Sequence, residues 1–409
     1  MERLCYLGLT LLTALLMAIA PLNPARAAAP ELRGVWLTNV DSQVLFSPTA
    51  LDQALHNLAN HRFNTVYPAM WSWGYTLFPS QVGERATGYK QGLYPDLEAQ
   101  GRNDALEAAQ GDRDLLQDML QTAHGLNLSV IPWFEFGFMA PANSPLVQRH
   151  PDWLTQTQGP LPAARHYQEG RHDRMWLNPF HPEVQQFMLD LVAELMDNYD
   201  VDGLQLDDHF GLPVAFGYDP YTIALYRREH QGQAPPANPQ DAEWTRWRAN
   251  KITEFVDRLF WTVKARRPGA VLSVSPNTAA YAYTHFLQDW PRWRQRGYIE
   301  ELIVQVYRDS VTEFRRILGD RELQQARRHI PTGVGILSGL KDKQVPTAQI
   351  QQQVQVARQM GFAGVSFFFY DTLWAGADAN ARATRAQIIQ QLFARHRERP
   401  EVIGVQGGR

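Results

Sequence analysis

The sequence of 409 residues contains a single cysteine, Cys5, which lies among the first 27 residues. The rest of the chain has no thiol, which excludes disulfide bonds, a thiolate nucleophile and cysteine-ligated zinc there. An excess of charge of one sign is also missing, because the formal net charge is −3. This balance does not favour nucleic acid or an anionic membrane surface as the main partner.

Several motifs of common chemistries are absent as well. The chain has no Gly-x-Ser-x-Gly elbow of a serine hydrolase and no HExxH or HxH spacing of a typical metal site. Gly333, Gly335 and Gly339 lack the spacing of a dinucleotide-binding loop, and they lie in a predicted strand and its exit. We therefore predict no cofactor and no resident metal.

The first 27 residues have the features of an export signal. Arg3 supplies a positive charge, residues 4–20 are apolar, and the Ala-Arg-Ala at 25–27 is a small-x-small cleavage pattern. Pro21 and Pro24 end the apolar run early, which favours a cleaved signal over a retained anchor without deciding between them. No later segment is apolar enough to cross a bilayer, so we expect an exported protein, periplasmic or secreted, without stable membrane insertion.

Strand-like and helix-like segments alternate through the rest of the chain. Eight strands, each followed by a helix, predict an α/β fold of the (β/α)₈ TIM-barrel type with long loops at the C-terminal face. We expect one domain over residues 28–397 after a signal at 1–27, and a loose tail at 398–409; the oligomeric state is left open. The predicted strands are 32–39, 64–71, 128–136, 201–210, 270–277, 301–307, 330–337 and 364–370. The predicted helices are 48–61, with Ser47 as N-cap, 112–124, 182–199, 244–267, 281–296, 311–319, 347–360 and 378–397.

Residues 201–210, with the sequence VDGLQLDDHF, are the most informative stretch. Leu204 and Leu206 alternate with Gln205 and Asp207, which is the period of a strand. In a barrel the outward face packs on helices, whereas the inward face can be polar near the C-terminal mouth. The same alternation in the later strands predicts a group of inward-facing residues at the mouth: Asp207, His209, Asn277, Gln305 and Tyr307.

Carboxylates, Trp, Tyr, Asn and Gln at a barrel mouth are typical of glycoside hydrolysis. The reaction needs one carboxyl group to protonate the leaving oxygen and another to act as nucleophile or base. Asp207 is the stronger candidate for nucleophile or base, with Asp208 as its support or alternative. Glu135 is the candidate acid, because Phe134 and Phe136 on either side would raise its pKa.

Three simpler interpretations remain open for these residues. Glu135 could form an ion pair with Arg171 or Arg174, and Asp371 after the last strand reads better as a helix cap than as a catalytic group. Asp207, Asp208 and His209 could form a His/Asp metal site together with His172 or His181. Lone histidines more often form hydrogen bonds, so the metal site is the weaker reading.

Aromatic and amide side chains predict the substrate contacts. Trp and Tyr rings stack on the apolar faces of sugars, although each of these rings could equally belong to the core. The candidate sugar platforms are Trp36, Trp71, Trp133, Tyr307, Tyr370 and Trp374. Asn277 and Gln305 are candidate partners of hydroxyl or acetamido groups, and His209 is a further candidate substrate contact.

Six motifs in the same order resemble the glycosyl-hydrolase-like 10 family: ELRGVWLT at 31–38, WLNP and HPEV at 176–184, VDGLQLDDHF at 201–210, SVSP at 273–276, IVQVY at 303–307 and GVSFF at 364–368. The likeness spans residues 31–395. It implies a TIM-type barrel with glycosidase activity and, for bacterial envelope members, cleavage of peptidoglycan strands, especially those free of stem peptides. It places the family's acidic strand end on Asp207 and Asp208, and its aromatic-acid strand end on Trp133 and Glu135. Many relatives have an aromatic residue at the position of His209.

We therefore expect an exported glycoside hydrolase that cleaves O-glycosidic bonds in an envelope polysaccharide by a two-carboxylate mechanism. One alternative is a glycan-binding barrel without catalysis. The other is a metal-dependent polysaccharide deacetylase or lyase, because barrels support many chemistries.

Overall fold

A computed structural model describes residues 29–92, 113–170 and 172–402. The predicted signal at 1–27, including Cys5, lies outside the described residues. So do residue 112, the predicted start of one helix, and residues 403–409 of the predicted tail.

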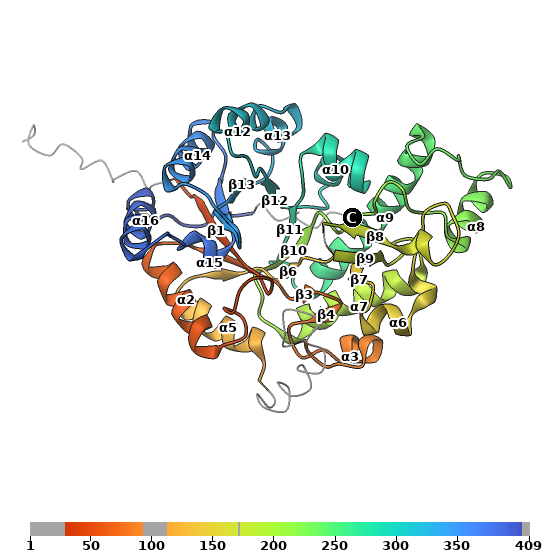
Figure 1. The fold of residues 1–409 in the computed structure, drawn as a ribbon, viewed down its shortest axis with the longest axis horizontal. Coiled ribbons are helices and arrows are strands. Elements are labelled where there is room, and N and C mark those ends of the chain that lie inside the picture. Colours follow the sequence, from red (N-terminus) through yellow and green to blue (C-terminus); the bar gives the residue numbers. More distant parts are fainter. Residues whose placement is uncertain (1–28, 93–112, 171, 403–409) are drawn as a thin grey trace, which may run out of the picture.

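The centre of the molecule is a parallel sheet of nine strands surrounded by helices (Figure 1), in the order β5-β2-β1-β16-β13-β12-β11-β10-β6. β5 (Ser129–Val130) and β6 (Trp133–Phe134) are two parts of one predicted strand, interrupted at Pro132, which has no N–H to donate. β5 pairs with β2, β6 pairs with β10, and a bridge joins Ala69 to Trp133, so the ring closes as an eight-stranded barrel. This confirms the predicted fold class. The other barrel strands are β1 (Leu32–Leu37), β2 (Thr65–Pro68), β10 (Gly203–Asp207), β11 (Val271–Ser275), β12 (Glu301–Gln305), β13 (Thr332–Leu337) and β16 (Gly364–Phe368).

Helices cover the outside of the barrel (Figure 1). The Ser47 side chain caps the first of them by accepting from the backbone N–H of Ala50 at 3.2 Å, as predicted. The helix predicted at 281–296 is two helices, because Leu287 adopts a left-handed conformation with φ 57°. The outer helices are α2 (Pro48–Asn60), α5 (Leu115–Gly125), α7 (Pro182–Asn198), α9 (Ala242–Arg266), α10 (Ala279–Phe286), α11 (Trp290–Gln295), α12 (Val311–Leu318), α13 (Arg321–Ala326), α14 (Thr347–Gln359) and α16 (Ala379–Leu392).

The long segments after the second and third barrel strands are more regular than predicted. The segment at 137–178, expected to be a loop, forms an antiparallel sheet in the order β7-β9-β8. This sheet lies on the same side of the barrel as β6 and β10 (Figure 1). Short strands pair across a tight turn here, which residue-by-residue periodicity does not detect. The elements of these segments and of the one after β10 are β3 (Trp71–Ser72), β4 (Tyr75–Thr76), α3 (Gln81–Thr87), β7 (Met139–Pro141), α6 (Pro145–Arg149), β8 (Tyr167–Glu169), β9 (His172–Trp176) and α8 (Pro220–Glu229).

Polar side chains inside the barrel are hydrogen-bonded to one another. The Trp36 indole N–H donates to Gln205 Oε1 at 2.7 Å, and the Gln205 amide donates to Ser273 Oγ at 3.0 Å. These bonds satisfy buried groups that would otherwise destabilise the fold. They also show that Gln205 and Ser273 face inward, as the sequence alternation predicts. Among the described helices none is long and apolar enough to cross a membrane.

Candidate active site

Asp207 is the last residue of β10, and its side chain points into the mouth of the barrel. It is 3 % exposed, and its Oδ1 accepts from the Gln305 amide at 2.8 Å. The same amide also donates to the carbonyl of Ser275 at 2.9 Å, which fixes its orientation. Burial and, after it, the charge of Asp208 raise the pKa of Asp207 well above its ordinary value.

Asp208 follows the end of the strand, where the chain turns, so it does not continue the outward side of the alternation. The Asn277 amide donates to its Oδ2 at 2.7 Å, and its Oδ1 lies 3.6 Å from His209 Nδ1. The turn after β10 therefore brings Asp208 to the mouth beside Asp207. The two adjacent aspartates interact strongly, and the charge of Asp208 favours the neutral form of Asp207.

His209 connects four acidic residues through its two ring nitrogens. Nδ1 lies 3.1 Å from the backbone carbonyl of Glu135, and Nε2 lies 3.1 Å from Glu169 Oε1. A carbonyl and an ionised carboxylate can only accept, so both nitrogens carry protons. Burial disfavours the charged ring, but the charge of Asp208, the bond to Glu169 and the charge of Asp207 outweigh it and raise the pKa of His209 to about 10.

The protonation of His209 affects whether Asp207, Asp208 and His209 could bind a metal ion. Asp207, Asp208 and His209 offer ligand atoms within 4.8 Å of one another. A metal needs a free lone pair on the imidazole, and neither nitrogen has one when both donate hydrogen bonds. His172 packs its ring against Trp73 at 5.7 Å, and the described residues place neither it nor His181 in the group. A metal at this group would therefore have to displace a proton and a hydrogen bond of His209.

Glu135 follows β6 and is only partly accessible, between two phenylalanines. Its Oε2 accepts from the Ser72 hydroxyl at 3.1 Å. Burial raises its pKa to about 7, although the positive charge of His209 and the Ser72 bond act in the opposite direction. Gly137 lets this segment approach the turn after β10, because it has φ +49° and a Cβ there would lie 2.5 Å from the carbonyl of His209.

Sequence reasoning missed Glu169 and assigned Arg174 to the wrong acid. Arg174 Nε lies 3.3 Å from Glu169 Oε2, and its guanidinium lies over the rings of Trp73 and Phe136 at 4.6 and 5.0 Å. The other proposed partner of Glu135, Arg171, lies outside the described residues. His209 and Arg174 lower the pKa of Glu169 to about 2 against the effect of burial. The Glu-Gly turn between alternating residues at 167–174 was the available signal for this hairpin.

Two of the proposed sugar platforms belong to the core. Trp36 and Trp71 are 1 % and 0 % exposed, so neither offers a ring face to a sugar. The Trp71 indole N–H donates to the carbonyl of Gly137 at 2.9 Å, which holds the segment that follows Glu135 in place. Trp133 is also buried, with its ring 6.3 Å from Phe368, but its indole N–H has no partner among the described residues.

Two further platforms lie away from the carboxyl group. Tyr370 and Asp371 belong to α15 (Tyr370–Leu373), which turns outward directly after β16. Asn57 of α2 lies 3.5 Å from the Tyr370 hydroxyl, and Trp374 packs on His61 at 4.7 Å. Tyr370 and Trp374 thus pack beside α2, and their role as sugar platforms stays a prediction. Asp371 is an exposed acid in the first turn of α15.

Other aromatic side chains do surround the carboxyl group. Tyr307 stacks on Phe368 with ring centroids 5.6 Å apart, and its pKa is raised by burial and by the charge of Asp207. Trp73 is partly exposed beside Arg174. Tyr281 on α10 is 46 % exposed. Sequence reasoning named only Tyr307 of these, because the rim loops bring the others close from distant positions.

A closed (β/α)₈ barrel with clustered carboxyl and aromatic side chains at its C-terminal mouth defines a glycosidase-type barrel. The chain belongs to the glycosyl hydrolase-like 10 family, whose model matches residues 31–357. It is 27 % identical over 312 residues to the glycosyl hydrolase DigH of Escherichia coli, covering 68 % of this chain and 62 % of DigH. The chain thus spans about three fifths of the length of that relative.

Solved structures agree on the fold. The glycoside hydrolase domain of PgaB (BpsB) from Bordetella bronchiseptica has a TM-score of 0.60 at 15 % identity, covering 87 % of this chain and 98 % of the domain. A β-galactosidase from Bacillus circulans has a TM-score of 0.58 at 11 % identity, covering 89 % of this chain and 55 % of that one. At these identities the similarity concerns the barrel alone.

The protonation of His209 can be tested by NMR. We expect its ring signals to show the charged form up to about pH 9, because its pKa is about 10. Glu169→Gln should lower this pKa by about one unit or more, since it removes a charged hydrogen-bond partner. Asp173→Asn is the matched control, because it removes the exposed contact to His166 at 2.8 Å on the same hairpin. A wild-type His209 that titrates near its ordinary pKa would contradict this geometry.

The pKa of Glu135 predicts a pH-dependent stability. Its folded value of about 7 exceeds the ordinary 4.5, so the folded state binds more protons between these values and stability falls as pH rises through them. Compared with Glu135→Gln, the wild type should lose about 2–3 kcal/mol of unfolding free energy between pH 5 and 8. Denaturant unfolding across this range measures the difference. Glu84→Gln, a substitution at an exposed site on α3, should follow the same dependence of unfolding free energy on pH as the wild type. Parallel dependences for the wild type and Glu135→Gln would refute the raised pKa of Glu135.

Proposed function

We propose that the protein is a glycoside hydrolase that cleaves O-glycosidic bonds in a bacterial envelope polysaccharide. The observation that carries this proposal is the gathering of Glu135, Asp207 and Asp208 around His209 at one barrel mouth. Burial raises the pKa of Glu135 to about 7, and the Gln305 and Asn277 amides hold the carboxyl groups of Asp207 and Asp208. Glycoside hydrolysis needs this combination of a proton donor and an ionised carboxylate.

Each group then has a role that follows from its surroundings. Glu135 protonates the leaving oxygen, because its apolar setting keeps the proton available near neutral pH. The Asp207–Asp208 pair faces the oxocarbenium-like transition state and supplies the nucleophile or base.

The rim supplies contacts for a glycan. The stacked rings of Tyr307 and Phe368, together with exposed Tyr281, offer faces on which sugar rings can stack. These contacts suit the ring faces, hydroxyl groups and acetamido groups of a glycan strand.

The substrate class that we propose is peptidoglycan glycan strands, especially strands without stem peptides. It rests on the likeness of the six sequence motifs to envelope members of the family. Export by the signal at residues 1–27 would bring the protein to the periplasm or the outside of the cell, where this polymer is found. DigH from Escherichia coli and YngK from Bacillus subtilis are both named glycosyl hydrolases.

The activity is tested by incubating the protein with peptidoglycan, intact or freed of stem peptides, and detecting new reducing ends by mass spectrometry. We expect products from the peptide-free strands. Asp207→Asn should lower turnover by about 10³-fold or more while the protein remains folded, since it removes a carboxyl group that we propose acts as nucleophile or base. Asp371→Asn is the matched control and should retain activity, because this exposed acid of α15 makes no hydrogen bond or ion pair with Glu135, Asp207 or Asp208 within the described part of the chain.

An unchanged rate in Asp207→Asn would contradict the assignment of the site. Binding of strands without any product would indicate a glycan-binding barrel instead. Release of acetate that a chelator abolishes would indicate a metal-dependent deacetylase.

A further inference from the structure

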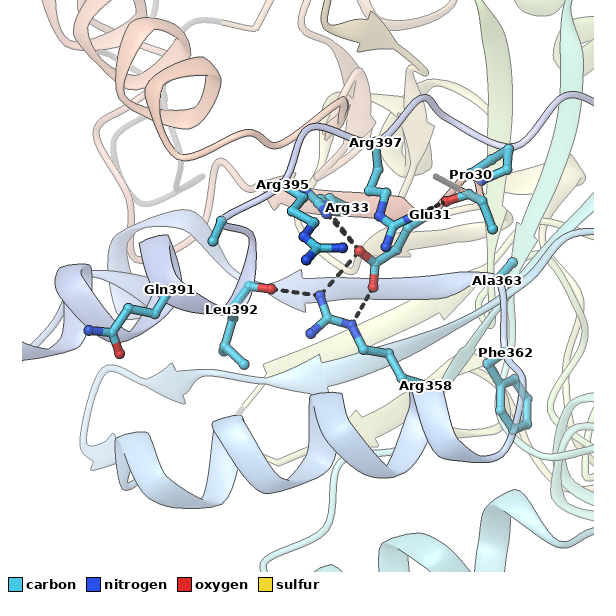
Figure 2. A pocket seen from close by; sticks show the side chains of 12 residues that line it. Pro30, Glu31, Arg33, Arg358, Phe362, Ala363, Gln391, Leu392, Arg395 and Arg397 are labelled. Carbon is cyan, nitrogen blue, oxygen red and sulfur yellow. Dashed lines mark hydrogen bonds and ion pairs between the residues drawn. The ribbon is translucent and has the colours of Figure 1, made fainter. Parts of the chain in front are cut away.

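A second cavity, of about 540 Å³, opens at the end of the barrel opposite to Asp207. It lies where the parallel strands β1 and β16 begin, and the last turn of α14 and the segment that ends α16 complete its walls (Figure 2). We call it the basal pocket and define it by Glu31, Arg33, Arg358, Arg395 and Arg397.

The basal pocket has more positive than negative charge. Four arginines and one glutamate line it, and Figure 2 shows the four guanidinium groups gathered around the Glu31 carboxylate. Glu31 is already shared, because Arg33 donates to it at 2.8 and 3.0 Å and Arg358 at 2.5 and 3.1 Å. The other nearby acid is Glu398, whose Oε1 lies 3.5 Å from His396 Nδ1.

Arg395 and Arg397 therefore remain available to a ligand. Within the described part of the chain, neither has a carboxylate at ion-pair distance, and Arg397 donates only to the carbonyl of Ala29 at 3.1 Å. Their side chains extend from the segment that follows α16 toward the Glu31 carboxylate (Figure 2). One carboxylate cannot neutralise four guanidinium groups, so the pocket attracts an additional anion.

The floor of the pocket is rigid. Arg33 is 1 % exposed, its Nη1 donates to the carbonyls of Arg62 and Phe393 at 3.2 and 3.4 Å, and its guanidinium lies 4.7 Å from the Phe393 ring. Arg358 donates to the carbonyl of Leu392 at 2.8 Å. Because backbone carbonyls hold these side chains in place, a ligand would meet an oriented charge and lose little affinity to ordering them.

We propose that the basal pocket binds a ligand that carries a phosphate monoester or pyrophosphate group. Guanidinium groups match phosphate oxygens in paired hydrogen bonds, and a group with two or more charges balances the excess better than one carboxylate. Phe362, Leu392 and Pro30 in the wall can contact the organic part that bears the phosphate. No residue is shared with the barrel mouth, so this proposal does not depend on the proposed hydrolase activity.

Isothermal titration calorimetry of the protein with inorganic pyrophosphate tests the proposal. We expect binding at one site and a loss of affinity of about tenfold or more in Arg395→Gln/Arg397→Gln. These two side chains form no ion pair among the described residues, so the variant should keep the thermal unfolding midpoint of the wild type. Arg227→Gln/Arg228→Gln is the matched control, because it removes two exposed arginines of α8 and equal charge.

A second arm identifies the source of the phosphate. Sedimentation with phosphatidylcholine vesicles that contain phosphatidic acid, lost in Arg395→Gln/Arg397→Gln, would show that the pocket takes a lipid headgroup. Binding of pyrophosphate without sedimentation would show that it takes a soluble phosphate ligand. The absence of both kinds of binding would overturn the proposal, as would equal losses in the test and control variants.

Discussion

The charged ring of His209 is the constraint on which the candidate active site depends. It joins three segments that are distant in sequence, namely the end of β6, the hairpin of β8 and β9, and the turn after β10. Its positive charge compensates the buried acids around it, which would otherwise repel one another and resist burial. Without this charge, we expect the carboxyl groups to move apart or all to become protonated.

The barrel determines where this charge can lie. Closure through the divided third strand places Trp133 next to Gln205 and Ala69, so the acids that follow β6 and β10 emerge side by side. Buried tryptophans fill the space beneath, and the hydrogen bond from Trp36 to Gln205 satisfies the polar group in the layer below Asp207. These buried tryptophans therefore hold the side chains of the mouth in position, and they do not offer their own rings to a substrate.

Strand alternation predicted the fold and part of the site, because period and turn chemistry are local properties. Asp207 and Gln305 face inward as expected, and Asp208 joins them through the turn after β10. Glu169 was not predicted, because a three-residue strand is too short to show a period and its partner His209 lies 40 positions away. The packing of Tyr370 and Trp374 beside α2 could not be predicted, because the direction of a chain after its strand depends on tertiary packing.

The most direct test of the account is a crystal structure of Glu135→Gln with a peptide-free glycan oligomer. We expect the oligomer to lie across the barrel mouth, with one glycosidic oxygen about 3 Å from the side chain at position 135. The carboxyl groups of the Asp207–Asp208 pair should lie on the other side of the same sugar. An oligomer bound elsewhere, or one whose linkage oxygens are out of hydrogen-bond reach of this side chain, would contradict the central claim.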